Sequence, residues 1–189
     1  MHQTRRSLLT GIAVIGGGTL LSAVLAPGRA LAATGGQIAA DAARALRHLY
    51  AAQPKTRALG QRAKAILVFP QIVKAGLIIG GQGGDGALLE NGRARGFYNI
   101  AAASFGLQIG AQTFSYALFF MNDSALQYLE SSDGWAIGTG PSVVVVDKGA
   151  AASLTSTTLS HDVYAVPFGQ KGLMAGVEIE GSKITHIHP

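Results

Sequence analysis

The amino-acid sequence predicts an α+β fold dominated by strands: an antiparallel sheet or partly closed barrel with an N-terminal amphipathic helix and one or two short helices. The chain has 26 glycines and one tryptophan among 189 residues, which is typical of a β-rich chain with many tight turns. Hydrophobic residues make up 48% of the chain and charged residues 13%, so the core can be large and disorder is not expected. Apolar residues recur at helical spacing only early in the chain, and short strand-like runs follow.

The N-terminal leader has the pattern of a secretory signal peptide. Arg5 and Arg6 precede an uncharged run over residues 7–28, and the small-residue sequence Ala30-Leu31-Ala32 closes the segment. Paired arginines just before a mildly apolar segment also resemble the twin-arginine export pattern.

We therefore expect residues 1–32 to be a twin-arginine-like signal peptide and residues 33–189 to form a single domain. Export would place that domain in the periplasm or cell envelope, where it can associate peripherally with a membrane. A retained membrane anchor is the alternative, because Ser7 to Pro27 is about long enough to span a bilayer.

Two helices are predicted ahead of the sheet. From Gln37 to Tyr50 apolar residues recur at the spacing of an amphipathic helix, and Pro54 limits its extent. Thr56 can cap a short second helix that runs to Ala63. Arginines occupy the exposed positions of both predicted helices, so positive charge is expected to collect there.

The segment from Arg62 to Leu89 predicts two buried strands and a wide turn. Ile66 to Phe69 is an apolar run that Pro70 stops, and a second apolar run extends from Ile72 to Ile79. The glycines that follow, up to Gly86, indicate a turn or bulge that leads into the next hairpin.

That hairpin is predicted from Asn91-Gly92, the pair that best tolerates the positive φ angles of a tight turn between two strands. Its strands are expected over Gly86–Glu90 and Ala94–Tyr98. Residues 122–124 supply capping side chains for a brief helix through Leu129, with Ser124 and Gln127 at capping-box spacing. The remaining strands are expected over residues 101–110, 112–121, 135–137, 142–147, 151–159, 163–167, 172–180 and 183–187.

Positive charge is concentrated in the first half of the domain. The whole chain has 15 basic and 10 acidic residues, but three arginines lie in the leader, which leaves 12 minus 10, or +2. Residues 41–95 contain nine basic and three acidic residues, whereas residues 96–189 contain three and seven. Such a split suits binding to an anionic surface, and a solvated helix face is the alternative interpretation.

Motifs for nucleotide binding and cysteine chemistry are not supported. Gly81 to Gly86 matches G-x-G-x-x-G, but a hairpin is predicted after it in place of the helix that a dinucleotide site requires. The chain has no cysteine, which excludes disulfides, thiolate metal sites and cysteine nucleophiles.

Catalysis by serine or histidine has little support either. No serine lies in G-x-S-x-G, and an enzyme that uses His161 and Asp162 is a weaker alternative to a polar turn at that place. His186 and His188 alternate on one strand, but two ligands without a carboxylate favour an exposed tail over a metal site. We therefore predict no catalytic residue, no metal site and no cofactor.

Four segments resemble the SYLF domain family. They are R-A-K-A-I-L-V-F-P from Arg62 to Pro70, V-K-A-G-L from Val73 to Leu77, the glycines from Gly80 to Gly86, and K-G-L-M-A-G-V-E-I-E-G-S from Lys171 to Ser182. The likeness spans Ile38 to Ser182, with both end motifs in order.

The resemblance implies a lipid-binding domain. Eukaryotic members bind phosphoinositides and, in yeast, actin filaments through an N-terminal amphipathic helix and basic residues, and bacterial members are typically exported. In this chain the helix corresponds to Gln37–Tyr50, and the lysines of the first two motifs are Lys64 and Lys74. The helix has fewer lysines than eukaryotic members show, and the glycine- and alanine-rich segment is only partly kept at 148–153. Actin is not expected as a partner of an exported bacterial protein.

Charge pattern and resemblance together predict a non-catalytic module that binds anionic lipid, or phosphoinositide-like headgroups, at a membrane surface. No nucleic-acid partner is expected. A structural envelope protein that binds another protein through a sheet edge or the amphipathic helix is the alternative. The residues predicted to contact lipid are Arg44, Arg47, Arg57, Arg62, Lys64 and Lys74.

Overall fold

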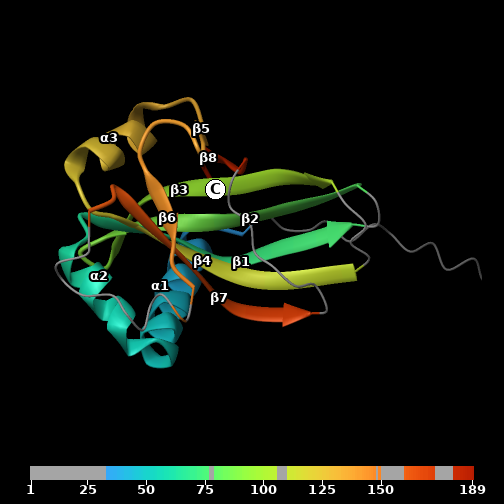
Figure 1. Cartoon of the computed structure of the whole chain (residues 1–189), viewed down its shortest axis with the longest axis horizontal. Helices are drawn as coiled ribbons and strands as arrows, with labels where there is room; N and C mark the ends of the chain where they lie inside the picture. The colour runs from blue at the N-terminus through green and yellow to red at the C-terminus, as the bar shows by residue number, and fades with distance from the viewer. Residues whose placement is uncertain (1–32, 77–78, 106–109, 148, 150–159, 173–180) are drawn as a thin grey trace, which may run out of the picture. The chain divides into compact units, whose positions relative to one another are not determined.

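The structure is a computed structural model that describes residues 33–189 apart from 77–78, 106–109, 148, 150–159 and 173–180 (Figure 1). The predicted signal peptide lies outside the described residues. So do the strand predicted over 151–159, the glycine- and alanine-rich segment except for residue 149, and nearly all of the strand predicted over 172–180.

The described chain is α+β and dominated by strands, as predicted. Its helices are α1 (Gly35–Ala52), the 3-10 turn η1 (Pro54–Thr56), α2 (Arg57–Arg62) and α3 (Asp123–Ser131). Its strands are β1 (Ala65–Gly76), β2 (Ile79–Glu90), β3 (Arg93–Phe105), β4 (Gly110–Phe120), β5 (Trp135–Ala136), β6 (Val143–Val145), β7 (Val163–Gly172) and β8 (Lys183–Ile187).

These strands form one sheet in the order β5-β8-β3-β2-β1-β4-β7-β6, which curls into an open half-barrel (Figure 1). Neighbouring strands in the described sheet are antiparallel except for β6 and β7, which are parallel. The antiparallel prediction therefore holds for all but one edge of the sheet.

Helix α1 begins and ends where local signals place it. The Thr34 hydroxyl accepts a hydrogen bond from the Gln37 backbone N–H (3.4 Å), and the Gln37 side-chain oxygen accepts one from the Thr34 N–H (3.0 Å). This reciprocal pair is a capping box. The helix ends at Gln53, directly before Pro54, so the predicted helix over Gln37–Tyr50 is confirmed.

The apolar side of α1 packs on the sheet. Ile38, Ala42 and Leu49 are buried in one core with Val68 of β1 and Leu89 of β2. This packing leaves those side chains away from the surface of the domain.

The short second helix is present, but Thr56 does not cap it as predicted. Thr56 is buried with helical backbone angles, and its hydroxyl donates a hydrogen bond to the carbonyl oxygen of Gln53 (2.7 Å). Thr56 therefore closes the turn that joins α1 to α2, and the buried Leu59 holds α2 on the same core.

Pro70 does not end a strand, which corrects the prediction of two strands on either side of it. Strand β1 continues through Pro70, and its register with β4 shifts between Phe69 and Ile72. A bulge of this kind accommodates a residue that has no N–H for the ladder. The Ser115 hydroxyl of β4 donates a hydrogen bond to the Pro70 carbonyl oxygen (2.7 Å).

The glycine-rich stretch lies inside β2, so the predicted turn is wrong. A Cβ atom built on Gly86 would lie 2.5 Å from the carbonyl oxygen of Val68 in β1, and one on Gly84 would overlap the Gln71 carbonyl oxygen. These glycines therefore allow β2 to approach the bulged part of β1 closely.

The Asn91-Gly92 hairpin is confirmed. Asn91 has φ 51° and Gly92 has φ 77°, as a two-residue turn with two positive φ angles requires. Both strands are longer than predicted, because β3 continues to Phe105 and includes the first residues of the strand that was expected separately over 101–110.

The sheet has a core on each side. One face, here called the α1 face, packs against α1 and α2. The other, here called the α3 face, packs against α3 and the segment that follows it, including Trp135. Side chains of β4 alternate between the two faces: Phe114, Tyr116, Leu118 and Phe120 belong to the α3 face, and Ala117 and Phe119 to the α1 face.

Candidate functional site

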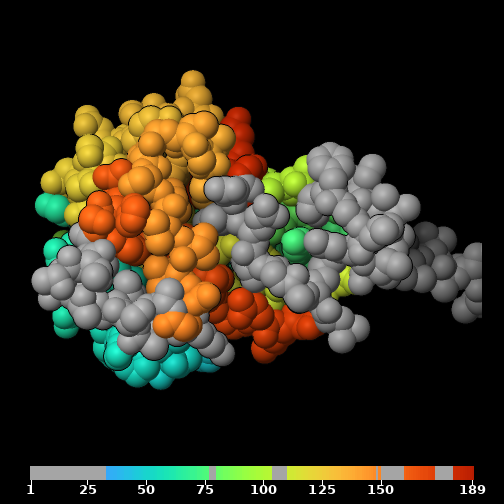
Figure 2. All heavy atoms as spheres, in the orientation of Figure 1, coloured from blue at the N-terminus to red at the C-terminus, as the bar shows by residue number. Residues whose placement is uncertain are grey.

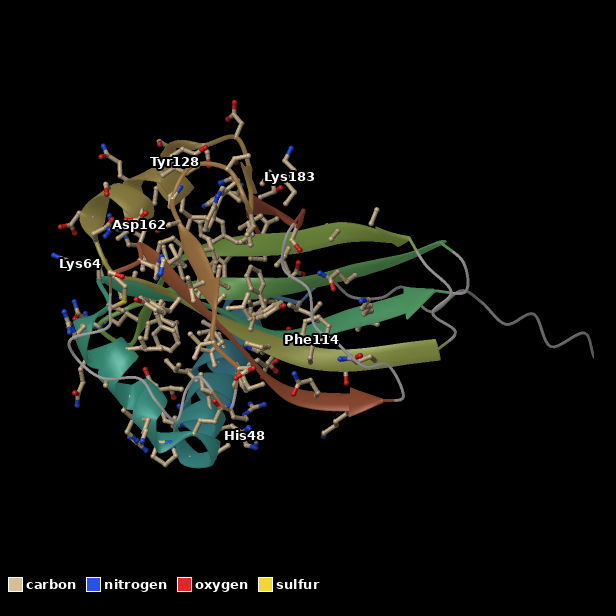
Figure 3. All side chains as sticks on the ribbon, in the orientation of Figure 1. His48, Lys64, Phe114, Tyr128, Asp162 and Lys183 are labelled. Carbon is tan, nitrogen blue, oxygen red and sulfur yellow. The ribbon has the colours of Figure 1, made fainter. Side chains whose placement is uncertain are left out.

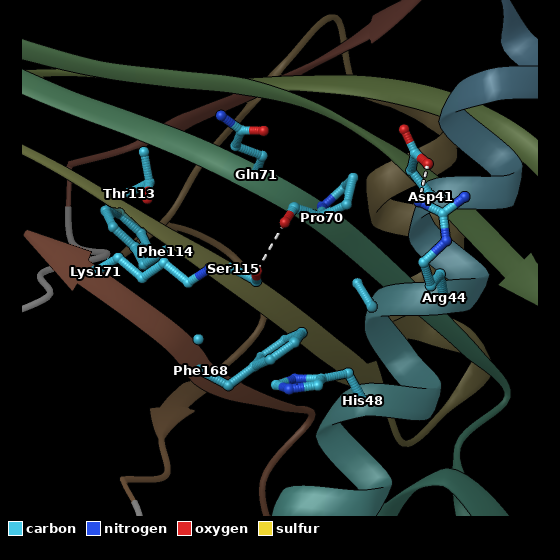
Figure 4. A pocket seen from close by; sticks show the side chains of 12 residues that line it. Asp41, Arg44, His48, Pro70, Gln71, Thr113, Phe114, Ser115, Phe168 and Lys171 are labelled. Carbon is cyan, nitrogen blue, oxygen red and sulfur yellow. Dashed lines mark hydrogen bonds and ion pairs between the residues drawn. The ribbon is translucent and has the colours of Figure 1, made fainter.

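A groove lies between α1 and the strands β1, β4 and β7 (Figure 4). Its volume is about 560 Å³. The helix contributes Asp41, Arg44, Ala45 and His48, and the strands contribute Pro70, Gln71, Thr113, Phe114, Ser115, Phe168, Gly169 and Lys171.

The helical wall follows from the period of α1. Asp41, Arg44 and His48 are three or four residues apart, so they lie along one side of the helix. The Arg44 guanidinium forms an ion pair with the Asp41 carboxylate (2.9 Å), and both side chains are largely exposed. In Figure 4 His48 points toward Phe168 of β7.

Two irregularities in the sheet form the opposite wall. One is the bulge of β1 at Pro70, and the other is a shift in the register between β4 and β7 from Thr113 to Ser115. Gly169, with φ 66°, lies at the second shift. Because bulges bend and twist the strands that contain them, they separate this part of the sheet from α1.

The groove is predominantly basic. Arg44 and Lys171 contribute two cationic side chains and His48 an imidazole ring, against one carboxylate on Asp41. Lys171 pairs with Thr113 across the β4–β7 ladder and extends over the groove from β7 (Figure 4). Such a groove suits an anionic group that needs several hydrogen-bond donors.

Five of the six residues predicted to bind lipid lie on or next to the two N-terminal helices. Arg44 and Arg47 are exposed on α1, Arg57 and Arg62 are exposed on α2, and Lys64 directly precedes β1. Figure 2 shows the end of α1 and the residues after it, in cyan, forming the lower surface of the domain.

Several of these cations have partners. The Lys64 ammonium pairs with the Asp123 carboxylate of α3 (3.0 Å), at an exposed position. The Arg57 guanidinium lies over the Tyr50 ring, 5.3 Å from its centroid. Burial raises the pKa of the Tyr50 phenol, and the charge of Arg57 opposes that rise.

Lys74 is not part of this surface. It lies on the α3 face of β1, directly opposite Gln82 of β2 and Gln112 of β4, and it is buried. The structure therefore does not bring Lys74 together with the other five cations, and its contact with lipid stays a prediction.

Of the residues that line the groove, the sequence prediction of lipid contacts included only Arg44 and missed the others, among them His48 and Lys171. The helical period that placed Arg44 also places His48 one turn further along the same side. Lys171 begins the last of the family-like segments, so it was quoted for the resemblance. Its place opposite α1 depends on the pairing of β4 with β7, which is not local in the sequence.

The His161-Asp162 pair lies in a network of structural hydrogen bonds. The Asp162 carboxylate accepts bonds from the Ser142 N–H (2.9 Å), the Ser142 hydroxyl (2.8 Å) and the Asn122 side-chain amide (2.7 Å). These bonds, led by that of the Ser142 backbone, lower the pKa of Asp162. The carboxylate thus ties the start of α3 and the residue before β6 to the start of β7.

Within the described ranges, no three histidine, aspartate or glutamate side chains are grouped so that they could hold a metal ion. His186 and His188 stack edge to face, with ring centroids 4.6 Å apart. None of the helices in this part of the chain is long and apolar enough to cross a membrane.

Comparison with family models assigns the second half of the domain. Residues 101–188 match the model of Ysc84, the SYLF domain, which is described as a Las17-binding protein actin regulator. This match confirms, over residues 101–188, the resemblance to the SYLF family. No curated protein matches the chain.

The SYLF segment includes the end of β3, β4, α3 and β5 to β8. It therefore contains Lys171 and two of the strands that line the groove, β4 and β7, whereas α1, α2 and β1 precede it. The family is one of binding domains, which agrees in its coarser form with the prediction of a binding module.

Proposed function

We propose that this protein is a non-catalytic module that binds anionic lipid through the basic surface of α1 and α2. One observation supports the proposal above the others. Four arginines lie on α1 and α2, and Lys64 follows two residues after the end of α2. All five fall within 21 residues of sequence, and one of these arginines, Arg44, lines the groove.

Binding is electrostatic and peripheral, without insertion of α1. An amphipathic helix that inserts must bury its apolar side in the membrane. Ile38, Ala42 and Leu49 already bury theirs against the sheet, so α1 presents its basic side to the lipid while it stays docked.

The groove is the site for a single headgroup. Arg44 and Lys171 face it from opposite walls, and Thr113 supplies a hydroxyl group between them, whereas the Ser115 hydroxyl already donates to the Pro70 carbonyl oxygen. A phosphate offers three or more oxygen acceptors, which suits this combination of cations and neutral donors. A phosphoinositide-like headgroup is therefore the ligand class that we propose for the groove.

The expected affinity for a membrane is modest. Each basic residue close to an anionic surface contributes about 1 kcal/mol, so three contacts give about 3 kcal/mol. The ion pairs of Arg44 and Lys64 with neighbouring carboxylates reduce the net charge of the surface. Binding is then reversible and weakened by salt.

Export is part of the same proposal. The leader pattern of residues 1–32 supports a location in the periplasm or cell envelope, at the membrane that supplies the anionic lipid. Secretion of a tagged chain from its bacterial host, followed by N-terminal sequencing of the product, tests the location and the cleavage together.

Flotation of the full chain with vesicles tests lipid binding. We expect the chain to bind vesicles of equimolar phosphatidylglycerol and phosphatidylcholine more tightly than vesicles of phosphatidylcholine alone. The double charge reversal Arg44→Glu with Arg47→Glu should weaken binding to the anionic vesicles by at least about tenfold. The proposal is wrong if wild type binds neither vesicle at low salt.

The matched control reverses two exposed cations outside the surface, Arg93→Glu and Lys183→Glu. It changes the net charge by the same amount, so equal losses in both double variants would show that overall charge, and not the α1 surface, governs binding. Both variants keep the leader, which removes its own affinity for lipid from the comparison.

A protein partner is the second candidate, and one observation favours it. Beyond the end of α1, the α1 face of the sheet exposes apolar side chains. Val73 of β1 is 45% exposed, and Ala75 of the same strand and Ala111, which lies opposite Ala75 on β4, are also exposed. A partner that binds there would protect Val73. Co-purification of a stoichiometric protein that is lost in a Val73→Asp variant would favour this candidate.

A further inference from the structure

The α1 face continues past the end of α1 as exposed sheet. Its residues there are small and uncharged on four neighbouring strands, and Val73 of β1 is 45% exposed. Figure 3 shows the strands continuing past Phe114, on the side away from the two N-terminal helices. We call this surface the distal strip, and its residues are Val73 and Ala75 of β1, Gly81 and Gly83 of β2, Ala101 and Ala103 of β3, and Ala111 of β4.

The distal strip is contiguous, because its residues lie opposite one another in the sheet. Val73 pairs with Gly83, and Gly83 pairs with Ala101. Residues opposite one another in adjacent strands have Cβ positions about 5 Å apart on the same face. The remaining four residues form the next row in the same way: Ala111 with Ala75, Ala75 with Gly81, and Gly81 with Ala103.

Gly81 and Gly83 are not required by the packing of the domain. A Cβ atom on either would lie 3.5 Å from the nearest backbone oxygen, which is an ordinary contact, and neither residue has a positive φ angle. Gly84 and Gly86, in contrast, allow β2 to approach β1. Glycine weakens a strand relative to alanine, and inside a strand it often marks the close approach of a ligand. A ligand that lies on the strip therefore explains two glycines that the fold does not.

The strip begins where the groove ends. Val73 lies directly opposite Thr113 of β4, and Thr113 lies opposite Lys171 of β7. Both Thr113 and Lys171 line the groove. One row across the sheet therefore leads from the Lys171 ammonium, through the Thr113 hydroxyl, to Val73 and Gly83. A surface that is cationic at one end and apolar at the other is complementary to an amphiphile with an anionic head.

We propose that the distal strip binds an acyl chain of the lipid whose phosphate occupies the groove. The site rests on the proposed function, because it requires an anionic head between Arg44 and Lys171. The chain leaves the groove past Thr113 and lies over Gly81 and Gly83, where its methylene groups are removed from water. Neighbouring strands are about 4.8 Å apart, so the four strands of the strip give the chain a path of about 14 Å.

The chemistry of the strip favours an acyl chain over a protein partner. A protein interface of ordinary composition contains about one hydrogen bond per 100–200 Å². The seven residues of the strip have no polar side chain, and an acyl chain needs none. The ligand is therefore one lipid molecule that is held by both its head and its chain.

Calorimetric titration of the full chain with soluble lipids tests the proposal. Dioctanoyl phosphatidylglycerol, kept below its critical micelle concentration, supplies head and chains, and glycerophosphoglycerol supplies the head alone. We expect one molecule of dioctanoyl phosphatidylglycerol to bind per chain. Its affinity should exceed that of glycerophosphoglycerol by at least about tenfold, which corresponds to the burial of two methylene groups.

Two variants locate the chain. Gly83→Leu fills the middle of the strip, so it should weaken binding of dioctanoyl phosphatidylglycerol at least about tenfold and leave that of glycerophosphoglycerol unchanged. Val73→Ser, a smaller change at an exposed position, should weaken it in the same selective way. Ala94→Leu is the matched control, because Ala94 is exposed on β3 beside the Asn91 turn, outside the strip, and it should bind both probes as wild type does.

The outcomes separate this proposal from lipid binding itself. It is overturned if wild type binds the two probes equally, or if Gly83→Leu and Val73→Ser bind dioctanoyl phosphatidylglycerol as wild type does, while flotation with anionic vesicles persists. Absence of flotation and of binding to either probe would instead remove the proposed function. A protein that co-purifies with wild type and is lost in Gly83→Leu, with unchanged lipid affinity, would assign the strip to a protein partner and also overturn the proposal.

Discussion

Gly86 of β2 lies so close to Val68 of β1 that a Cβ atom at Gly86 would be 2.5 Å from the Val68 carbonyl oxygen. Real Cβ atoms do not approach backbone oxygen this closely, so the two strands can pair only where one of them has no side chain. The glycines of β2 are thus a condition for the bulge in β1, and the bulge in turn forms one wall of the groove.

Alanine at Gly86 is therefore expected to destabilise the domain. The added methyl group would push β2 away from β1 at a buried position, at a cost of about 1–3 kcal/mol. Urea unfolding followed by circular dichroism measures the difference. Gly83→Ala is the matched control, because its Cβ would lie 3.5 Å from the nearest backbone oxygen, an ordinary contact. Equal losses at both positions would contradict the explanation.

Asp162 should make stability depend on acid. Hydrogen bonds from Ser142 and Asn122 hold the folded-state pKa of Asp162 below its unfolded value. The group therefore stabilises the fold above the unfolded pKa, about 3.9, and that contribution is lost as pH falls through the lower, folded pKa. Asp162→Asn should be less stable than wild type at pH 7.

The difference between Asp162→Asn and wild type should shrink when unfolding is measured at successively lower pH below about 4. Asp133→Asn, at an exposed position, is the control and should show no such convergence. A difference that stays constant down to pH 2 would mean that the carboxylate charge contributes nothing.

The Lys64–Asp123 ion pair should matter for lipid more than for stability. Both side chains are exposed, at 49% and 80%, and such pairs contribute about 0–1 kcal/mol. Asp123→Asn releases Lys64 and removes a negative charge beside the basic surface, so it should strengthen flotation with anionic vesicles. Its unfolding midpoint should change little. Weaker flotation would argue against Lys64 as a lipid contact.

Helix α1 should stay docked on the sheet when the domain binds vesicles. Leu49→Ala should cost about 2–5 kcal/mol of stability, because Leu49 is fully buried in the core that α1 shares with the sheet. Hydrogen exchange of the α1 amides should be the same with and without anionic vesicles. Faster exchange along α1 on vesicles would indicate that the helix detaches and inserts.

Features that depend on near neighbours in the sequence were predicted well. The helix predicted over Gln37–Tyr50 from its apolar period and Pro54 is present as α1, and the hairpin predicted from Asn91-Gly92 is present too. In both cases residues within one or two turns determine the backbone, so the pattern is sufficient.

Features that depend on a neighbouring strand were missed. In the sequence, Pro70 and the glycines near Gly86 have the pattern of strand ends. In the structure β1 and β2 continue through them, because the glycines of β2 leave room for the bulged backbone of β1. The position of Lys74 follows from the same bulge, which shifts the alternation of side chains between Phe69 and Ile72 and turns Lys74 toward the α3 face. The arginines of α1 and α2 were placed correctly, because helix period alone determines their exposure.

The pairing of β3 with β8 has a consequence for how the chain reaches its folded form. Phe97 of β3 lies opposite Ile187 of β8, so this part of the sheet cannot form until residue 187 has been synthesised. Contacts this distant in sequence form slowly. Export machinery for unfolded chains could therefore bind this chain before β8 pairs with β3. Export machinery for folded proteins could act only after that pairing has formed.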